Sequence, residues 1–142
     1  MWHAAPSAVF EGYTLGDAST RLGLLSGFGF TLPPPPASHT DALQALRIPE
    51  SFDARQVWGD SCSSVTTIRN QGDCGGCWAF SAAETLADRF CIAASQATSA
   101  KYTNLSLSPQ WVLDCDTTDR GCGGGLLDDA WRFLQATGAV QE

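Results

Sequence analysis

The chain has 142 residues, enough for one modest hydrophobic core, and its 15 acidic and 8 basic residues give a net charge of −7. This acidic balance, with no basic patch, argues against nucleic acid as a partner, and no apolar stretch approaches the roughly 20 residues of a membrane span. Six cysteines favour synthesis through an oxidising compartment, yet no signal peptide is visible, so we expect the natural beginning of the chain to be missing.

The first 47 residues give weak structural signals. Residues 18–25 predict a short helix that Gly27 and Gly29 would end, and residues 38–47 predict no more than one weak turn of helix. Between them, the four prolines at 33–36 favour a stiff polyproline II linker. On composition alone, a disordered tail is the alternative interpretation of this region.

Residues 52–69 predict an extended and irregular segment, with Cys62 inside it. After it comes the run from Gln71 to Ser81, which begins with several glycines and then becomes rich in alanine. The glycines exclude regular structure before Cys77 and let backbone amides approach a ligand closely.

A central helix is predicted over residues 77–94, because no Gly or Pro follows Cys77 until Pro109 and good helix formers are frequent. The N-terminus of such a helix carries roughly half a positive charge, which favours the thiolate of Cys77, the nucleophilic form of cysteine. Gln71 lies on the loop that leads in, and its amide could donate a hydrogen bond to an oxygen that becomes negative when Cys77 attacks a carbonyl. The run therefore predicts a nucleophile and half of an oxyanion hole.

The central helix also has a predicted buried face, because apolar residues recur at every fourth position: Trp78, Ala82, Leu86 and Phe90. A polar loop follows over residues 95–107. It contains an N-glycosylation sequence that begins at Asn104.

Two shorter helices are predicted beyond that loop. Ser108 is a good N-cap, and Pro109 suits the first position of a helix that runs to about Asp114. After a loop over residues 116–125, residues 126–137 predict the last helix, with Gly138 as its C-cap. Its expected apolar face consists of Leu127, Ala130, Trp131 and Leu134.

Three stretches resemble papain-like cysteine proteases, in particular the cathepsin B type. The run Cys74-Gly75-Gly76-Cys77-Trp78 resembles the nucleophile segment of that family, with Gly76 in place of Ser or Ala. The block from Ile48 to Arg55, followed by Trp58, resembles the start of mature cathepsin B. The run Gly121-Cys122-Gly123-Gly124-Gly125 resembles the glycine-rich wall of the substrate cleft, with Gly123 where the family usually has Asn.

The resemblance implies an α+β, papain-like fold. Residues 48–142 would form the N-terminal, helical (left) half of the peptidase domain, and the β-rich right half would be missing. Residues 1–47 would be the end of a propeptide that inhibits its own enzyme. Within them, Phe28, Phe30 and the prolines at 33–36 supply apolar area that could lie in the cleft.

The resemblance also implies roles for single residues. Cys77 would attack a peptide bond of a peptide or protein substrate and form a thioester, and Gln71 would stabilise the oxyanion. The substrate-binding residues would be Gly75, Gly76, Trp78, Gly124 and Gly125.

If Cys77 is a free nucleophile, the five remaining cysteines cannot all pair within the chain. The family pattern implies the pairs Cys62–Cys91 and Cys74–Cys122, and it leaves Cys115 for a downstream partner that is missing. Without the family, six cysteines allow fifteen complete pairings.

A cysteine protease needs a His as base and a group that orients it. The chain contains only His3 and His39, both in the part that resembles a propeptide, whereas the family's His and Asn lie roughly 130–150 residues beyond the Cys. We therefore expect a catalytically incomplete fragment that is inactive by itself.

Other functions remain open on the sequence. A secreted, non-enzymatic cathepsin B-like relative would keep the fold, although such relatives typically lose the nucleophile that is present here. Cys74 and Cys77 form a C-x-x-C, which also occurs in thioredoxin-like redox sites and in zinc sites, where Cys115 and Cys122 would be the other ligands. The leading interpretation predicts no metal or cofactor, no nucleic-acid or membrane partner, and a lysosomal, endosomal or extracellular location.

Overall fold

The computed structural model describes residues 8–25, 49–96, 102 and 104–142. In these ranges it contains five α-helices and three short 3₁₀ helices: η1 (Ala8–Phe10), α1 (Leu15–Ser19), α3 (Ala54–Trp58), η2 (Ser63–Thr66), α4 (Cys77–Gln96), α5 (Pro109–Cys115), η4 (Gly121–Gly123) and α6 (Leu127–Thr137). The described ranges have no β-strand. Their two isolated bridges join Leu24 to Gly125 in parallel and Leu107 to Gln141 antiparallel.

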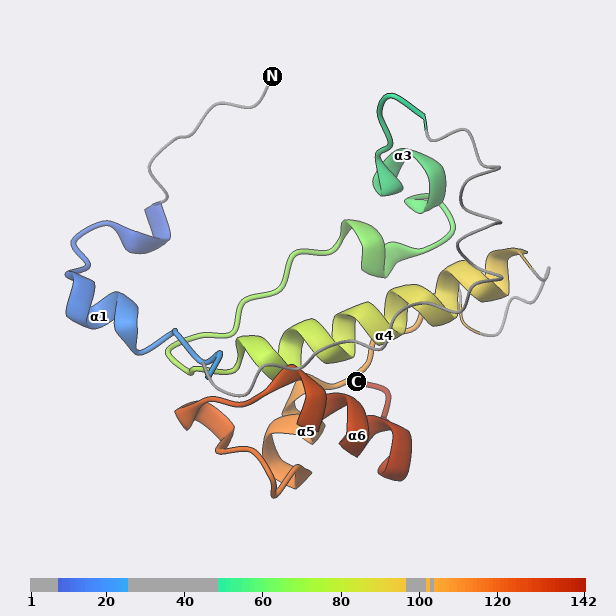
Figure 1. The fold of residues 1–142 in the computed structure, drawn as a ribbon. Coiled ribbons are helices and arrows are strands. Elements are labelled where there is room, and N and C mark those ends of the chain that lie inside the picture. The colour runs from blue at the N-terminus through green and yellow to red at the C-terminus, as the bar shows by residue number, and fades with distance from the viewer. Residues whose placement is uncertain (1–7, 26–48, 97–101, 103) are drawn as a thin grey trace.

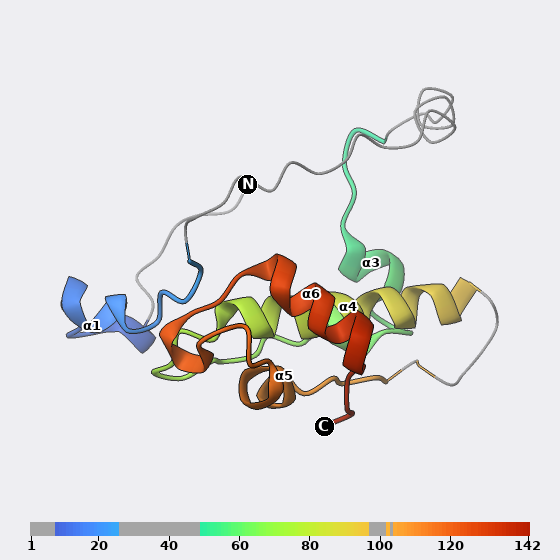
Figure 2. The ribbon, with the colours of Figure 1, turned by 60° about the horizontal axis from the view of Figure 1, so that its bottom comes forward.

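The long helix α4 is the centre of the described fold. Helices α5 and α6 both pack against it and against each other, on the side away from α3 (Figure 1). From the second direction, α6 crosses over α4 while α5 lies below the pair (Figure 2). This helical arrangement is what the resemblance to the helical half of a papain-like fold implies.

The core lies where α4 meets α5 and α6. Alanines such as Ala79 and Ala82 on α4 let the helices approach closely, and Trp78, the largest fully buried side chain, fills the space between them. Val112 from α5 and Leu134 from α6 complete this cluster. Because the start of α4 is anchored in the core through Trp78, the residue before it is held firmly in place.

The predicted ends of the two short helices are confirmed. The Ser108 hydroxyl accepts a hydrogen bond from the Trp111 amide at 3.2 Å, and Pro109 is the first residue of α5. Helix α6 ends at Thr137 and is capped by Gly138, whose φ of 87° favours glycine. The central helix is also confirmed, and it continues to Gln96, two residues beyond the predicted end.

The prediction of an extended segment over residues 52–69 was wrong, because the segment contains α3 and η2. Asp53 caps α3 by accepting a hydrogen bond from the Arg55 amide at 2.9 Å. A helix of five residues is too short to show an apolar periodicity, so it leaves little signal in the sequence.

The helix predicted over residues 18–25 was also misplaced. The observed helix α1 begins after Thr14, whose side chain and backbone exchange hydrogen bonds with Asp17 in a capping box. The stretch around Leu24 is instead paired with Gly125. The features predicted at Gly27, Gly29, Phe28, Phe30 and residues 33–47 lie outside the described residues.

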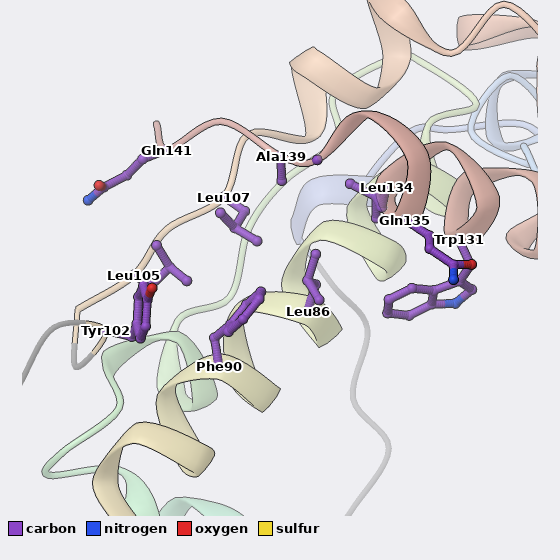
Figure 3. Close-up of a pocket in the computed structure, with 11 residues that line it drawn as sticks. Leu86, Phe90, Tyr102, Leu105, Leu107, Trp131, Leu134, Gln135, Ala139 and Gln141 are labelled. Atoms are coloured by element: carbon purple, nitrogen blue, oxygen red, sulfur yellow. The ribbon is translucent and has the colours of Figure 1, made fainter. Parts of the chain in front are cut away.

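The predicted apolar face of α4 is buried only over its first half. Trp78 and Ala82 are fully buried against α5 and α6, whereas Phe90 is 44% exposed and stacks on Tyr102. Leu86 and Phe90 line an open apolar pocket of about 510 Å³, which Leu134 closes from the side of α6 (Figure 3). On α6, likewise, Ala130 and Leu134 are buried but Leu127 is 37% exposed.

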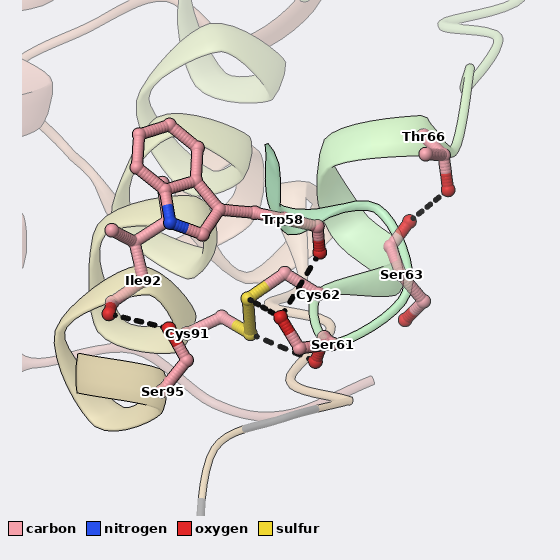
Figure 4. The surroundings of a disulfide bond; sticks show 8 residues. All are labelled: Trp58, Ser61, Cys62, Ser63, Thr66, Cys91, Ile92 and Ser95. Carbon is pink, nitrogen blue, oxygen red and sulfur yellow. Dashed lines mark hydrogen bonds between the residues drawn. A yellow bond between two sulfur atoms is a disulfide. The ribbon is translucent and has the colours of Figure 1, made fainter. Parts of the chain in front are cut away.

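A disulfide joins Cys62 to Cys91, with the two Cα atoms 5.7 Å apart (Figure 4). It fastens the chain between α3 and η2 to the later turns of α4, and both cysteines are fully buried. Around it, the Ser61 hydroxyl donates to the Trp58 carbonyl at 3.2 Å. The pair is the one that the family pattern implied.

Candidate active site

Cys77 is the first residue of α4, and its thiol is free and partly exposed. The first turn of the helix is closed by the Gly76 carbonyl, which accepts hydrogen bonds from the amides of Ala79 and Phe80 at 3.0 and 3.1 Å. The thiol therefore lies at the N-terminal end of a 20-residue helix, where the first backbone amides of the helix have no partner within it.

Gly76 tolerates a small side chain. A Cβ added there would lie 3.3 Å from the Cys74 sulfur and 3.4 Å from the Leu113 side chain, so the neighbours would need to shift by only a few tenths of an ångström. Gly75 is different, because its Cβ would lie 2.6 Å from the Cys122 carbonyl oxygen. A residue larger than glycine is excluded at position 75, whereas the Gly76 departure from the family signature has little effect on the backbone.

The glycine wall, residues 121–125, is fastened to the nucleophile loop, residues 71–76, by several bonds. A disulfide joins Cys74 to Cys122, as the family pattern implied, and the Gly75 amide donates to the Cys122 carbonyl at 3.1 Å. The Trp78 indole donates to the Gly121 carbonyl at 3.1 Å. The structure thus brings Gly75, Gly76 and Cys77 together with the wall.

Trp78 has a different place from the one expected of a substrate-binding residue. Its side chain is fully buried, and a Cβ added at Gly125 would lie 2.5 Å from its ring. The indole therefore lies behind the wall and fixes the position of Gly125. Gly124 has a φ of 106°, which favours glycine, and its amide donates to the Gly121 carbonyl at 3.2 Å.

The N-terminal part of the chain lies against this wall. The Gly125 amide donates to the Gly23 carbonyl at 2.8 Å, and the Leu25 amide donates to the Gly125 carbonyl at 3.1 Å. Residues 23–25, which we call the cleft segment, therefore run parallel to the wall. A peptide backbone already satisfies the two polar groups that Gly125 offers.

Gly23 is the point of closest approach. A Cβ added to it would lie 1.7 Å from the Gly75 carbonyl oxygen, a distance that no side chain can occupy. The cleft segment thus touches both the nucleophile loop and the wall, and it can do so only as glycine at this position. The sequence analysis missed Gly23, because nothing local distinguishes it from other glycines.

Gln71 also contacts the N-terminal part. Its Nε2 atom donates to the Cys74 carbonyl and to the Arg21 carbonyl, both at 2.7 Å. Both amide hydrogens are therefore engaged, one within the nucleophile loop and one with the residue that leads into the cleft segment. The expected hydrogen bond to an oxyanion would require release of one of them.

Arg21 fastens the same residues from outside. Its guanidinium donates to the Asp73 carboxylate at 2.7 Å and to the Tyr13 hydroxyl at 2.9 Å, and it lies over the rings of Phe10 and Tyr13. No local pattern predicts this contact between Arg21 and Asp73, which are 52 positions apart.

The C-x-x-C interpretations receive no support from the geometry. Cys74 is bonded to Cys122 and not to Cys77, so the described structure lacks a redox pair, and two of the four supposed zinc ligands are in that disulfide. The other free thiol, Cys115, ends α5. Among the described residues, no group of three or more His, Cys, Asp or Glu could hold a metal ion.

Three further expectations concern parts of the chain away from the cleft. His3 and His39 lie outside the described residues, so the described part of the chain contains no histidine that could act as the base. Asn104 is exposed in a turn, and its glycosylation stays a prediction. Of the described helices, none combines the length and apolar character that crossing a bilayer requires.

Comparison with known sequences places the chain among peptidases. Residues 48–142 match the family described as papain family cysteine protease. The chain is 36% identical over 141 residues to "Cathepsin B-like CP3" of Giardia intestinalis, an alignment that covers 99% of this chain and 44% of that protein. It is 42% identical over 110 residues to "Cathepsin B-like cysteine proteinase 4" of Caenorhabditis elegans, covering 72% of this chain and 31% of that protein.

Comparison with solved structures points to the same family. The structure of proCathepsin B S9 from Trypanosoma congolense is 27% identical, with a TM-score of 0.81 over 99% of this chain and 46% of that chain. Procathepsin L2 from Tenebrio molitor larval midgut gives a TM-score of 0.74 at 28% identity, covering 96% of this chain and 42% of that one. The chain spans less than half the length of these relatives.

Proposed function

The chain belongs to the papain family of cysteine proteases, within its cathepsin B-like members, and we propose on this basis that Cys77 is the nucleophile of a peptidase. The observation that carries the proposal is the place of Cys77, as a free and partly exposed thiol at the first residue of a long helix. In the reaction, the Cys77 thiolate would add to the carbonyl carbon of a peptide bond, the amine would leave with a proton, and water would hydrolyse the resulting thioester.

Gln71 would stabilise the oxyanion of that reaction. Its Nε2 atom has two hydrogens, of which one holds the Cys74 carbonyl and the other the Arg21 carbonyl. Departure of Arg21 would free one N–H for the developing negative charge. Gly124 and Gly125 would bind the substrate backbone, through the amide and carbonyl of Gly125 that now bind the cleft segment.

The N-terminal part would act as the enzyme's own inhibitor. The cleft segment uses the same backbone groups that a substrate would need, and the similarity to two proenzyme structures supports this role. We place the boundary between inhibitor and enzyme near Ile48, where the family match begins.

A peptidase with a cysteine nucleophile also needs a catalytic base. Hydrolysis requires a His to accept and return the proton, and the chain has only His3 and His39, both before the boundary. We propose that the 142 residues do not turn over substrate by themselves and that the His and Asn belong to a part of the longer protein that is not in this sequence. Two disulfides support a secretory route towards a lysosomal, endosomal or extracellular location.

A non-enzymatic cathepsin B-like protein is the alternative, and one experiment separates the two. The longest natural form of the protein, after removal of its N-terminal part, is assayed with a fluorogenic peptide and labelled with an epoxide that alkylates thiolates. We expect hydrolysis and labelling at Cys77, and loss of both in Cys77→Ser.

The matched control is Thr85→Ser, a conservative change at an exposed position of the same helix, which should change neither the rate nor the labelled peptide. Hydrolysis that persists in Cys77→Ser would refute the assignment. Labelling of Cys77 without any hydrolysis would favour the non-enzymatic alternative. For the 142-residue chain alone, we expect no turnover above background.

A further inference from the structure

Two carboxyl groups lie next to each other behind the glycine wall. Asp116 is the residue that follows α5, and Asp119 lies on the loop between α5 and η4. The two side chains are within hydrogen-bonding reach of each other. Asp116 is only 4% exposed, which is unusual for a carboxyl group that forms no ion pair with any described residue.

Each carboxyl group uses one oxygen for a backbone amide. Asp116 Oδ1 accepts from the Thr118 amide at 2.9 Å, and Asp119 Oδ1 accepts from the Leu126 amide at 2.8 Å. The second oxygen of each, Oδ2, is buried and receives no N–H or O–H from any described residue. A single proton held between the two carboxyl groups would give these oxygens the hydrogen bond that they lack.

The surrounding charges favour that proton. Asp129 on α6 adds a further negative charge near Asp119, but it is itself paired with Arg132 at 3.0 Å. Arg120 is exposed and forms no ion pair within the described residues. Burial raises the pKa of Asp119 to about 6, and the carboxyls of Asp116 and Asp129 add to the rise, while the Leu126 amide opposes it.

Asp119 also touches the wall directly. A Cβ added at Gly125 would lie 2.7 Å from the Asp119 carboxyl carbon, and the amide that Asp119 holds belongs to the next residue, Leu126. Gly125 is the residue whose amide and carbonyl bind the cleft segment. The orientation of those two groups therefore depends on the hydrogen bond between Asp119 and Leu126.

We propose that Asp116 and Asp119 share a proton in acid and thereby form a clamp that positions the glycine wall, with Asp119 as the positioning residue. When the shared proton is lost, two like charges meet in a poorly solvated place. Asp119 is partly exposed and can turn towards water, whereas Asp116 is buried and held by Thr118, so Asp119 moves and Leu126 loses its acceptor. The wall is then held less firmly at neutral pH than in acid.

The clamp is tested by hydrogen exchange of the Leu126 amide in the oxidised 142-residue chain, between pH 4 and 7.5 and corrected for intrinsic exchange rates. We expect its protection to fall by up to about tenfold per pH unit between about pH 4 and 6 and to level off above. Asp119→Asn keeps an acceptor for the Leu126 amide and gives Asp116 a permanent hydrogen-bond donor. In this variant, protection of the Leu126 amide should therefore not change with pH. Asp114→Asn removes an exposed carboxyl from the last turn of α5 and should follow the wild type.

The reciprocal variant, Asp116→Asn, allows the test to be made even if Asp119→Asn does not fold. In Asp116→Asn the amide donates to an ionised Asp119, so most of the pH dependence between 4 and 6 should disappear. A flat wild-type profile, or an undiminished fall in both variants, would overturn the proposal. Any effect of the clamp on hydrolysis rests on the proposed function of Cys77. Protection of the Leu126 amide is measured without substrate, so the clamp and the proposed function can be refuted separately.

Discussion

Glycine at position 23 decides whether the cleft segment can stay in place. Gly23 approaches Gly75 so closely that any Cβ would overlap the Gly75 carbonyl. We predict that Gly23→Ala displaces the segment, because the clash is with backbone and cannot be relieved by a rotamer change. The rate at which a thiol reagent alkylates Cys77 should then rise at least several-fold, as measured by mass spectrometry of the modified peptide.

The matched control for that substitution is Gly16→Ala. Gly16 lies in α1, and a Cβ added there would be 3.5 Å from the Thr14 hydroxyl, an ordinary contact. Gly16→Ala should therefore leave the alkylation rate unchanged. An unchanged rate in Gly23→Ala as well would show that the segment does not shield Cys77.

Single residues of the site differ in how far the sequence predicts them. Cys77 and Gln71 could be found because the glycines before a helix and the short motif around them are local features. Gly23 and Asp119 could not, because each acquires its importance from a contact that no local motif shows: with Gly75 for the first, and with Asp116 and Leu126 for the second.

At the level of elements, the disulfide between Cys74 and Cys122 connects the nucleophile loop to the wall across 48 residues of sequence. Loop-closure entropy predicts that such a crosslink stabilises the fold by roughly 3–4 kcal/mol. We expect Cys122→Ala to lower the urea concentration at which half of the fold is lost and to weaken binding of the cleft segment. The measurement is urea unfolding followed by tryptophan fluorescence.

Cys115→Ala is the control for the loss of a sulfur, because Cys115 is partly buried but forms no disulfide within the described residues. It should cost clearly less than Cys122→Ala. An equal loss in both variants would attribute the effect to packing of the thiol and not to the crosslink.

Helices were predictable in proportion to their length and their capping signals. The central helix and the two helices after it have long periodic patterns or clear caps at Ser108 and Gly138, and all three are present. Helix α3 was missed because five residues show no period, and α1 was displaced because the capping box at Thr14 was overlooked. Burial along α4 also depends on which neighbours cover it, and the sequence of α4 alone does not contain that information.

At the scale of the whole molecule, the pocket beside α4 and α6 is apolar and open. Leu86, Phe90 and Leu134 contribute to its walls, and the described chain leaves Phe90 44% exposed. Exposed apolar surface of this kind promotes association between molecules. We predict that the isolated, oxidised 142-residue chain self-associates at micromolar concentrations and melts over a broad range, as measured by light scattering after size exclusion and by a thermal melt.

We expect the pocket to cause that association, and not exposed apolar residues elsewhere on the surface. Phe90→Glu places a charge at its rim and should shift the chain towards the monomer. Ile68→Glu is the comparison, because Ile68 is 96% exposed, does not line the pocket, and should leave association largely unchanged. A monodisperse wild-type monomer with one steep melting transition would contradict the prediction. It would show that the isolated chain stays soluble and unfolds cooperatively despite the exposed apolar lining of the pocket.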